Sequence, residues 1–112
     1  ETPLFNLGTA NYKREEEHLF ARQWQQVLAD ISFPGIRRPV AENDVFKGDG
    51  YLLHWVQREF PETCLTMSID IKKIYCDEVT GEIYPLKFKR LSQELKKAIH
   101  SCAVIVQEKH LP

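Results

Sequence analysis

Histidine and cysteine side chains are the residues of this sequence that could hold a transition metal. The chain has four histidines and three cysteines. Structural zinc sites draw their ligands in closely spaced pairs, but the nearest pair here, His100 and Cys102, lies about 200° apart around a helix. We therefore expect no metal site, and we expect Cys102 to pack as a small hydrophobic residue of the core.

Known catalytic motifs do not occur in the sequence. It contains no G-x-S-x-G elbow, no glycine-rich phosphate loop and no H-E-x-x-H helix, and it has only five glycines. A cysteine nucleophile and a histidine base meet in space rather than in sequence, so no such pair is singled out. The adjacent acids Asp77 and Glu78 are typical of a solvated turn. We expect no enzymatic activity and no cofactor.

The most visible charged feature is a basic cluster near the start of the last expected helix. Between Lys87 and Lys97 five positive charges stand against one acid, Glu94. Such a surface suits an acidic partner, and nearby aromatic rings could stack on unpaired bases. Lysines at exposed helix positions are also ordinary, so a solvated helix face is the competing interpretation. The candidate partner-binding residues of this cluster are Lys72, Lys73, Tyr84, Lys87, Lys89, Arg90, Lys96 and Lys97.

Two further segments combine residue types that protein interfaces favour. One is the pair Arg37 and Arg38, which are also candidate partner-binding residues. The other is the segment 54–58, in which a histidine and an arginine flank Trp55. A tryptophan within an apolar segment is more often part of the core, so we expect both Trp24 and Trp55 to be buried.

Hydrophobic periodicity predicts three helices that would position these residues. Apolar residues recur at spacings of three and four over residues 11–31, 50–60 and 90–106. Thr9 or Asn11 is expected to cap the first helix.

Strict alternation of apolar and polar residues predicts a strand from Cys64 to Cys76. The turn residues 77–81 and a second alternating stretch, Tyr84 to Phe88, predict a hairpin, in which Pro85 restricts the second strand to a sheet edge. The expected fold class is α+β: an N-terminal helix, a second helix, an antiparallel β-hairpin forming a small sheet, and a C-terminal helix packed on that sheet.

The remaining segments have weaker patterns. Residues 1–12 are expected to form an N-terminal arm, and residues 13–112 a single α+β domain. A two-stranded hairpin is marginally stable, so another strand is expected beside residues 65–75. We favour an internal strand from Val40 to Lys47, while Leu4 to Leu7 or a second chain are alternatives. The remaining sheet edge or an adjoining helix groove is the expected partner site.

Charge and composition exclude several classes of protein. There are 15 basic and 16 acidic residues, a net charge of −1 and a pI near 6.5, which argues against bulk DNA binding. No apolar run approaches the ~20 residues of a membrane helix, so we expect no membrane partner. An odd number of cysteines favours an intracellular protein, in the nucleus or the cytoplasm. Because the chain starts at Glu1 and lacks a leader, we expect it to be excised from a longer protein.

Together these observations lead to one main functional hypothesis. We expect a non-enzymatic protein-interaction domain of a larger intracellular protein, whose partner is another protein or a second copy of the chain, bound at a sheet edge or an apolar groove. The alternative is binding of nucleic acid or an acidic ligand through the basic residues of the stretch from Lys72 to Lys97. The second alternative is an enzyme or regulatory domain with an unidentified site.

Overall fold

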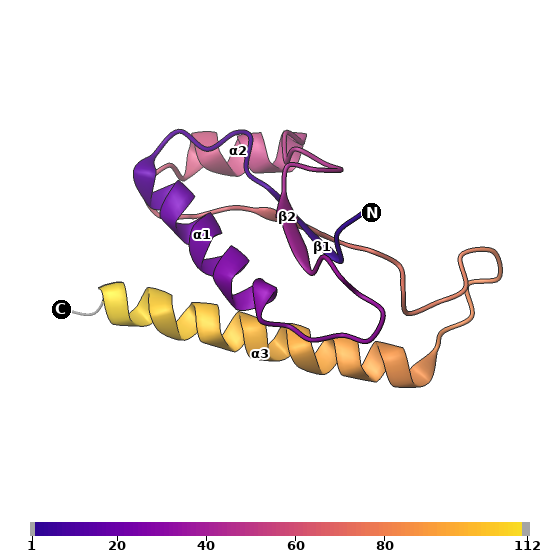
Figure 1. Ribbon diagram of the computed structural model, residues 1–112. Coiled ribbons are helices and arrows are strands. Elements are labelled where there is room, and N and C mark those ends of the chain that lie inside the picture. Colours follow the sequence, from indigo (N-terminus) through magenta and orange to yellow (C-terminus); the bar gives the residue numbers. More distant parts are fainter. Residues whose placement is uncertain (1, 111–112) are drawn as a thin grey trace. The chain divides into compact units, whose positions relative to one another are not determined.

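The computed structural model describes the backbone of residues 2–110 and the side chains of residues 2–103. The chain divides into two units, Glu1–Lys72 (unit 1) and Lys73–Pro112 (unit 2), and each is described by itself. Strands and helices alternate along the chain (Figure 1). Their bounds are β1 Phe5–Gly8, α1 Glu15–Ala29, β2 Val40–Glu42, α2 Tyr51–Glu59, β3 Ser68–Ile71 and α3 Pro85–His110. The α+β class is confirmed, with three helices and a three-stranded mixed sheet in the described residues.

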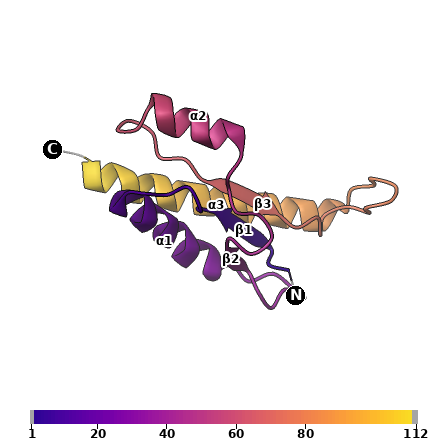
Figure 2. The same ribbon diagram turned by 90° about the horizontal axis from the view of Figure 1, so that it is seen from above.

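The sheet of unit 1 has the order β2-β1-β3, with β1 in the centre (Figure 2). β1 pairs in parallel with β2 and antiparallel with β3, so that Phe5 lies opposite both Val40 and Ile71. All four residues of β1 are buried, and Phe5 and Leu7 are fully so. The first strand of the chain is therefore the core of unit 1.

This central strand corrects two expectations. Residues 5–8 were assigned to an arm because the apolar cluster of Leu4, Phe5 and Leu7 between Pro3 and Gly8 shows no sustained period, and the strand has only four residues. The strand expected from Val40 to Lys47 ends at Glu42, and it pairs with β1 rather than with β3. The alternative source, Leu4 to Leu7, supplies the neighbour of β3. Whether residues 13–112 act as a single domain stays a prediction.

The expected turn at residues 77–81 forms, but the second strand of the expected hairpin does not. Pro85 begins α3, where its fixed φ and missing N–H suit the first helical position, so Tyr84 to Phe88 form no strand. Only an isolated bridge joins Cys76 and Ile83. Asp77 closes the turn between them, because its carboxylate accepts the backbone N–H groups of Val79 and Thr80 at 2.8 and 2.9 Å, which also lowers the Asp77 pKa. The hairpin sheet on which the last helix was expected to pack therefore does not form.

The first helix is confirmed, but its N-terminal cap is not the expected one. Arg14 precedes the first turn of α1, and the Glu17 carboxylate accepts the backbone N–H groups of Lys13 and Arg14 at 3.1 and 2.9 Å. Trp24 and Leu28 are buried on its inner face, as expected. The Trp24 indole N–H has no hydrogen-bond partner among the described residues.

The second and third helices are also confirmed, with different burial. No residue of α2 is buried. On α3, Leu91, Ala98 and Cys102 are buried, whereas Leu95 is half-buried and Ile99 exposed. Burial raises the pKa of the Cys102 thiol to about 11, in agreement with the expected core role. The side chain of Val106, the last member of the expected apolar stripe, lies outside the described residues. Within the described chain, no helix combines the length and apolar content needed to cross a bilayer.

Two glycines bring β1 and the segment before α2 into backbone contact. A Cβ placed on Gly8 would lie 2.6 Å from the Cα of Gly48 and would also meet the Ser68 hydroxyl. Gly48 has a positive φ of 72°, which favours glycine there as well. A side chain at either position would push the two segments apart.

We expect Gly8→Ala to lower the free energy of unfolding by about 1 to 3 kcal/mol, because the methyl group overpacks the contact with Gly48. Urea denaturation measures this loss. The matched control is Gly50→Ala, because a Cβ at Gly50 meets no atom within 4 Å; it should lose less than about 1 kcal/mol. Equal losses in the two variants would contradict a required close approach.

Candidate functional site

A loop between β2 and α2 is held by a buried amide of the central strand. We call residues 43–48 the display loop. Asn6, only 2% exposed, donates its Nδ2 hydrogen to the Phe46 carbonyl at 2.8 Å. Its Oδ1 accepts the backbone N–H groups of Asp44 and Val45 at 3.0 and 2.9 Å. One side chain therefore fixes three successive residues of the loop.

Further hydrogen bonds fix both ends of the display loop. Asn43 adopts a positive φ of 54°, and its side chain accepts the Thr9 backbone N–H at 2.8 Å and donates to the Thr9 hydroxyl at 3.1 Å. That hydroxyl donates to the Glu42 carboxylate at 2.8 Å. At the other end, the Asn11 amide donates to the Gly48 carbonyl at 2.6 Å. The loop backbone is thus ordered without burying the apolar side chains that it carries.

The display loop and α2 expose five large apolar side chains. Val45 and Phe46 are 47% and 55% exposed on the loop. On α2, Tyr51, Leu52 and Trp55 are 78%, 71% and 37% exposed. We call these five residues the apolar surface.

Trp55 corrects an expectation, because it was predicted to be buried. The inner side of α2 carries Leu53, Val56 and Gln57, which are half-buried, and Trp55 lies on the outer side. Its ring makes an edge-to-face contact with Phe60, at 5.9 Å between centroids. The apolar residues of α2 thus form two stripes, and only the inner one faces the rest of unit 1.

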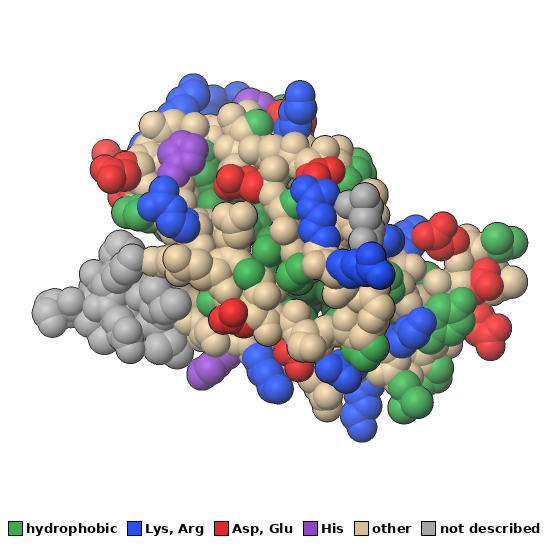
Figure 3. All heavy atoms as spheres, viewed as in Figure 1, with side chains coloured by type: hydrophobic (Ala, Val, Ile, Leu, Met, Phe, Trp, Pro, Cys, Tyr) green, Lys and Arg blue, Asp and Glu red, His purple; other side chains and the backbone are tan. Residues whose placement is uncertain are grey.

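A cleft of about 460 Å³ lies between the start of α1 and α2. We call it the basic cleft, because cationic side chains from the two residues before α1 and from α2 contribute to its walls. Figure 3 shows Lys, Arg and His side chains at the top of the view, over α2. The residues lining the basic cleft are Asn11, Lys13, Arg14, Glu17, His54, Gln57, Arg58 and Pro61.

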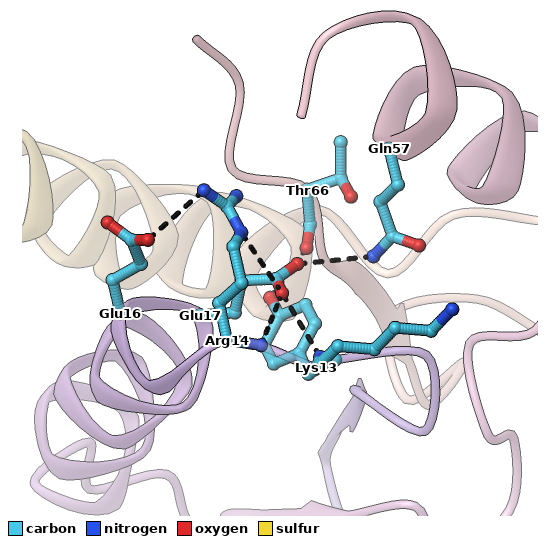
Figure 4. A network of polar contacts seen from close by, with 7 residues as sticks. Lys13, Arg14, Glu16, Glu17, Gln57 and Thr66 are labelled. Carbon is cyan, nitrogen blue, oxygen red and sulfur yellow. Dashed lines mark hydrogen bonds and ion pairs between the residues drawn. The ribbon is translucent and has the colours of Figure 1, made fainter. Parts of the chain in front are cut away.

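Glu17 organises one wall of the basic cleft (Figure 4). The side chain is buried, and besides capping α1 it accepts a hydrogen bond from the Gln57 amide at 3.4 Å and pairs with the Arg14 guanidinium at 3.5 Å. It thereby links α1 to α2. Tyr12, which donates its hydroxyl to the Thr66 carbonyl, is buried beside it, and burial together with the negative charges of Glu17 and Glu42 raises the pKa of that phenol.

The expected basic cluster is distributed over both units. Lys72 ends unit 1, and the other members belong to unit 2. Lys89, Lys96 and Lys97 are exposed and lie at i, i+7 and i+8, on one face of α3. Lys97 pairs with Glu94 at 3.6 Å.

Aromatic side chains accompany the cluster at the start of α3. The Lys87 ammonium lies 5.3 Å from the centre of the Tyr84 ring, a cation–π contact. Tyr75 and Phe88 make an edge-to-face contact at 6.0 Å. The structure thus places Tyr84 beside Lys87 within unit 2, and binding of a partner by these residues stays a prediction.

The other predicted residues lie elsewhere in unit 1. Arg37 and Arg38 are exposed in the segment before β2, and Arg38 pairs with Asp44 of the display loop at 2.5 Å. Arg38 thus supports the loop rather than joining the basic cluster.

Among the described residues, no group of three or more His, Cys, Asp or Glu side chains could hold a metal ion, and the three cysteines are free. Comparison with known proteins finds no matching family model, no matching curated protein and no matching solved structure. Sequence reasoning singled out the segment 54–58 but missed Val45 and Phe46, which it placed in the strand expected from Val40 to Lys47. The polar residue Asn6 between apolar neighbours was the available signal.

We expect Asn6→Ala to cost about 2 to 4 kcal/mol of unfolding free energy, because three backbone groups of the display loop lose their partner. Amide hydrogen exchange of residues 44–46 should accelerate in the same variant. Asn11→Ala, which removes a single hydrogen bond to the loop, is the matched control and should cost about 1 kcal/mol. Unchanged protection of residues 44–46 in Asn6→Ala would show that the loop is fixed by something else.

Proposed function

We propose that this chain is a non-enzymatic protein-interaction domain and that its apolar surface binds another protein. The observation that carries the proposal is the exposure of five large apolar side chains on a hydrogen-bonded loop and the helix that follows it. Exposed single apolar residues are normal, but five of them within residues 45–55 are more than a soluble surface requires and favour an interaction site.

The composition of the apolar surface suits binding. Tyrosine and tryptophan are the residues most enriched at energetic hot spots, and both are present on α2. Fully burying an exposed leucine or phenylalanine such as Leu52 or Phe46 contributes about 1.5 to 3 kcal/mol. Because Asn6 and Asn43 already order the display loop, its binding does not have to include the full entropic cost of ordering a flexible segment.

The charges beside the apolar surface define the partner that we propose. Arg58 lies at i+7 from Tyr51 and i+3 from Trp55, so it shares their face of α2. Beyond Arg58 lies the basic cleft. A segment of another protein with large apolar residues next to acidic ones would match this pattern, and we commit to that occupant.

The free sheet edges are less suited to the same role. The two outer strands, β2 and β3, have three and four residues, which allow few main-chain hydrogen bonds to an added strand. For this reason we favour the apolar surface over the sheet edge. The proposed compartment is intracellular, in the nucleus or the cytoplasm, because three free thiols suit a reducing environment.

A second candidate function is binding of nucleic acid by unit 2. It is favoured by the face of α3 that carries Lys89, Lys96 and Lys97, and by the exposed Tyr84 ring beside Lys87. Basic residues would neutralise phosphates, and an exposed aromatic ring could stack on an unpaired base. The net charge of −1 makes this the second choice.

Selection of peptides from a random phage library on the immobilised chain tests the first proposal. We expect enriched peptides to contain large apolar residues next to Asp or Glu. Leu52→Asp should weaken their binding about tenfold or more, because it places a charge in the apolar surface. Its melting temperature should stay nearly unchanged, since Leu52 is 71% exposed.

The matched control is Leu86→Asp, the same substitution at a leucine that is 84% exposed near the start of α3. It should leave peptide binding unchanged. Equal weakening in the two variants would contradict the assignment of the apolar surface. Sedimentation equilibrium tests whether the apolar surface binds a second copy of the chain instead. If the chain is a dimer that Leu52→Asp dissociates, the partner is a second copy, and the proposal of a different protein is overturned.

Charge reversal tests the second candidate. Replacing Lys89, Arg90, Lys96 and Lys97 by Glu should abolish binding to a labelled single-stranded oligonucleotide, and binding by the natural chain should weaken steeply with salt. Reversal of Arg22 and Lys47, outside the cluster, should have little effect. If the quadruple variant retains binding, the basic cluster does not carry it.

A further inference from the structure

The basic cleft has a charge pattern that the apolar surface does not explain. Lys13 and Arg14 approach it from the start of α1, and Arg58 from α2. Glu17 is the one acid in its lining, and it faces three cationic side chains, Lys13, Arg14 and Arg58. His54 adds a ring that can donate a hydrogen bond.

The carboxylate of Glu17, the one acid in the cleft lining, already has hydrogen-bond and ion-pair partners. The Glu17 carboxylate accepts the N–H groups of Lys13 and Arg14 and the Gln57 amide, and it pairs with the Arg14 guanidinium. In Figure 4 these contacts converge on Glu17, while the Lys13 side chain extends away from it. The carboxylate therefore does not satisfy the Lys13 ammonium.

The two arginines of the cleft form only weak ion pairs with neighbouring acids. Arg14 pairs with Glu16 at 3.1 Å and Arg58 pairs with Glu59 at 3.3 Å, both between partly or largely exposed side chains. Such pairs contribute little to stability, so a multivalent anion could displace them. For Lys13 and His54, no side-chain hydrogen bond or ion pair with another described residue exists.

We propose that the basic cleft binds a phosphate monoester. A phosphate monoester carries close to two negative charges at neutral pH, so it can bind the Lys13 ammonium and compete with Glu16 and Glu59 for the two guanidinium groups. Arginine forks can bind two of its oxygens at once, and a lysine can reach a third. The volume of about 460 Å³ lies within the usual range of small-ligand sites. This site goes beyond the proposed binding of a partner protein, because it is lined by different residues except for the flanking Arg58.

Titration of the full chain with O-phosphoserine, followed by two-dimensional NMR of the backbone amides, tests the proposal. At constant ionic strength and pH 7.5, we expect saturable shifts confined to residues 11–17 and 54–61. Acetate at equal concentration should shift these amides much less, because it carries one charge on two oxygens.

Variants on opposite walls of the cleft sharpen the test. Lys13→Gln and Arg58→Gln should each weaken phosphoserine binding about tenfold, because each removes one charge-assisted contact. Arg22→Gln, at an exposed arginine of α1 outside the cleft, is the matched control and should bind phosphoserine like the natural chain. Shifts spread over basic residues of the whole chain, or equal weakening in all three variants, would overturn the proposal.

Two further comparisons identify the source of the phosphate. Tighter binding of a phosphoserine peptide than of O-phosphoserine would indicate a modified protein segment, and tighter binding of a nucleoside monophosphate would indicate a small metabolite. Leu52→Asp should leave phosphoserine binding unchanged, because Leu52 does not line the cleft. If phosphoserine does not bind, the proposed peptide binding by the apolar surface is unaffected. If no peptide binds the apolar surface, the proposed phosphate binding is likewise unaffected.

Discussion

The carboxamide of Asn6 forms three hydrogen bonds with the backbone of the display loop from within the central strand, and the arrangement of unit 1 depends on them. A buried amide without partners would destabilise the core by several kcal/mol. The display loop therefore stays beside β1, where its backbone supplies those partners. The close backbone contact of Gly8 with Gly48 then fixes where the loop ends. The helix α2 begins three residues after Gly48, at Tyr51.

This constraint explains how an apolar surface can persist outside the core. Val45 and Phe46 would be expected to turn inward if the loop were free to rearrange, because burial of apolar area is favourable. The backbone hydrogen bonds made by Asn6 prevent this rearrangement, and the core is already filled by Leu4, Phe5 and Leu7. Stability of the fold and exposure of the apolar surface therefore arise from the same strand.

Glu17 has a comparable role at the basic cleft. Its carboxylate accepts two backbone N–H groups at the N-terminus of α1, and it also accepts a hydrogen bond from Gln57 of α2. One buried acid thus holds two basic segments near each other, which solvated lysines and arginines would not do alone. The apolar surface and the basic cleft meet at Arg58, so a partner with both apolar and anionic groups could contact the two together.

The sequence by itself determined the three helices, the buried Trp24 and the alternating segment that contains β3, because these depend on periodicity over many residues. It also singled out the segment 54–58. Only the tertiary structure decided that Phe5 to Gly8 form the central strand, since four residues are too few for a sustained alternation to distinguish a strand from an irregular segment. It likewise decided that Pro85 starts a helix, because proline is compatible with both a strand edge and a first helical turn. The exposure of Phe46 and Trp55 depends on long-range hydrogen bonds and on which face of a helix meets the core, and local sequence encodes neither.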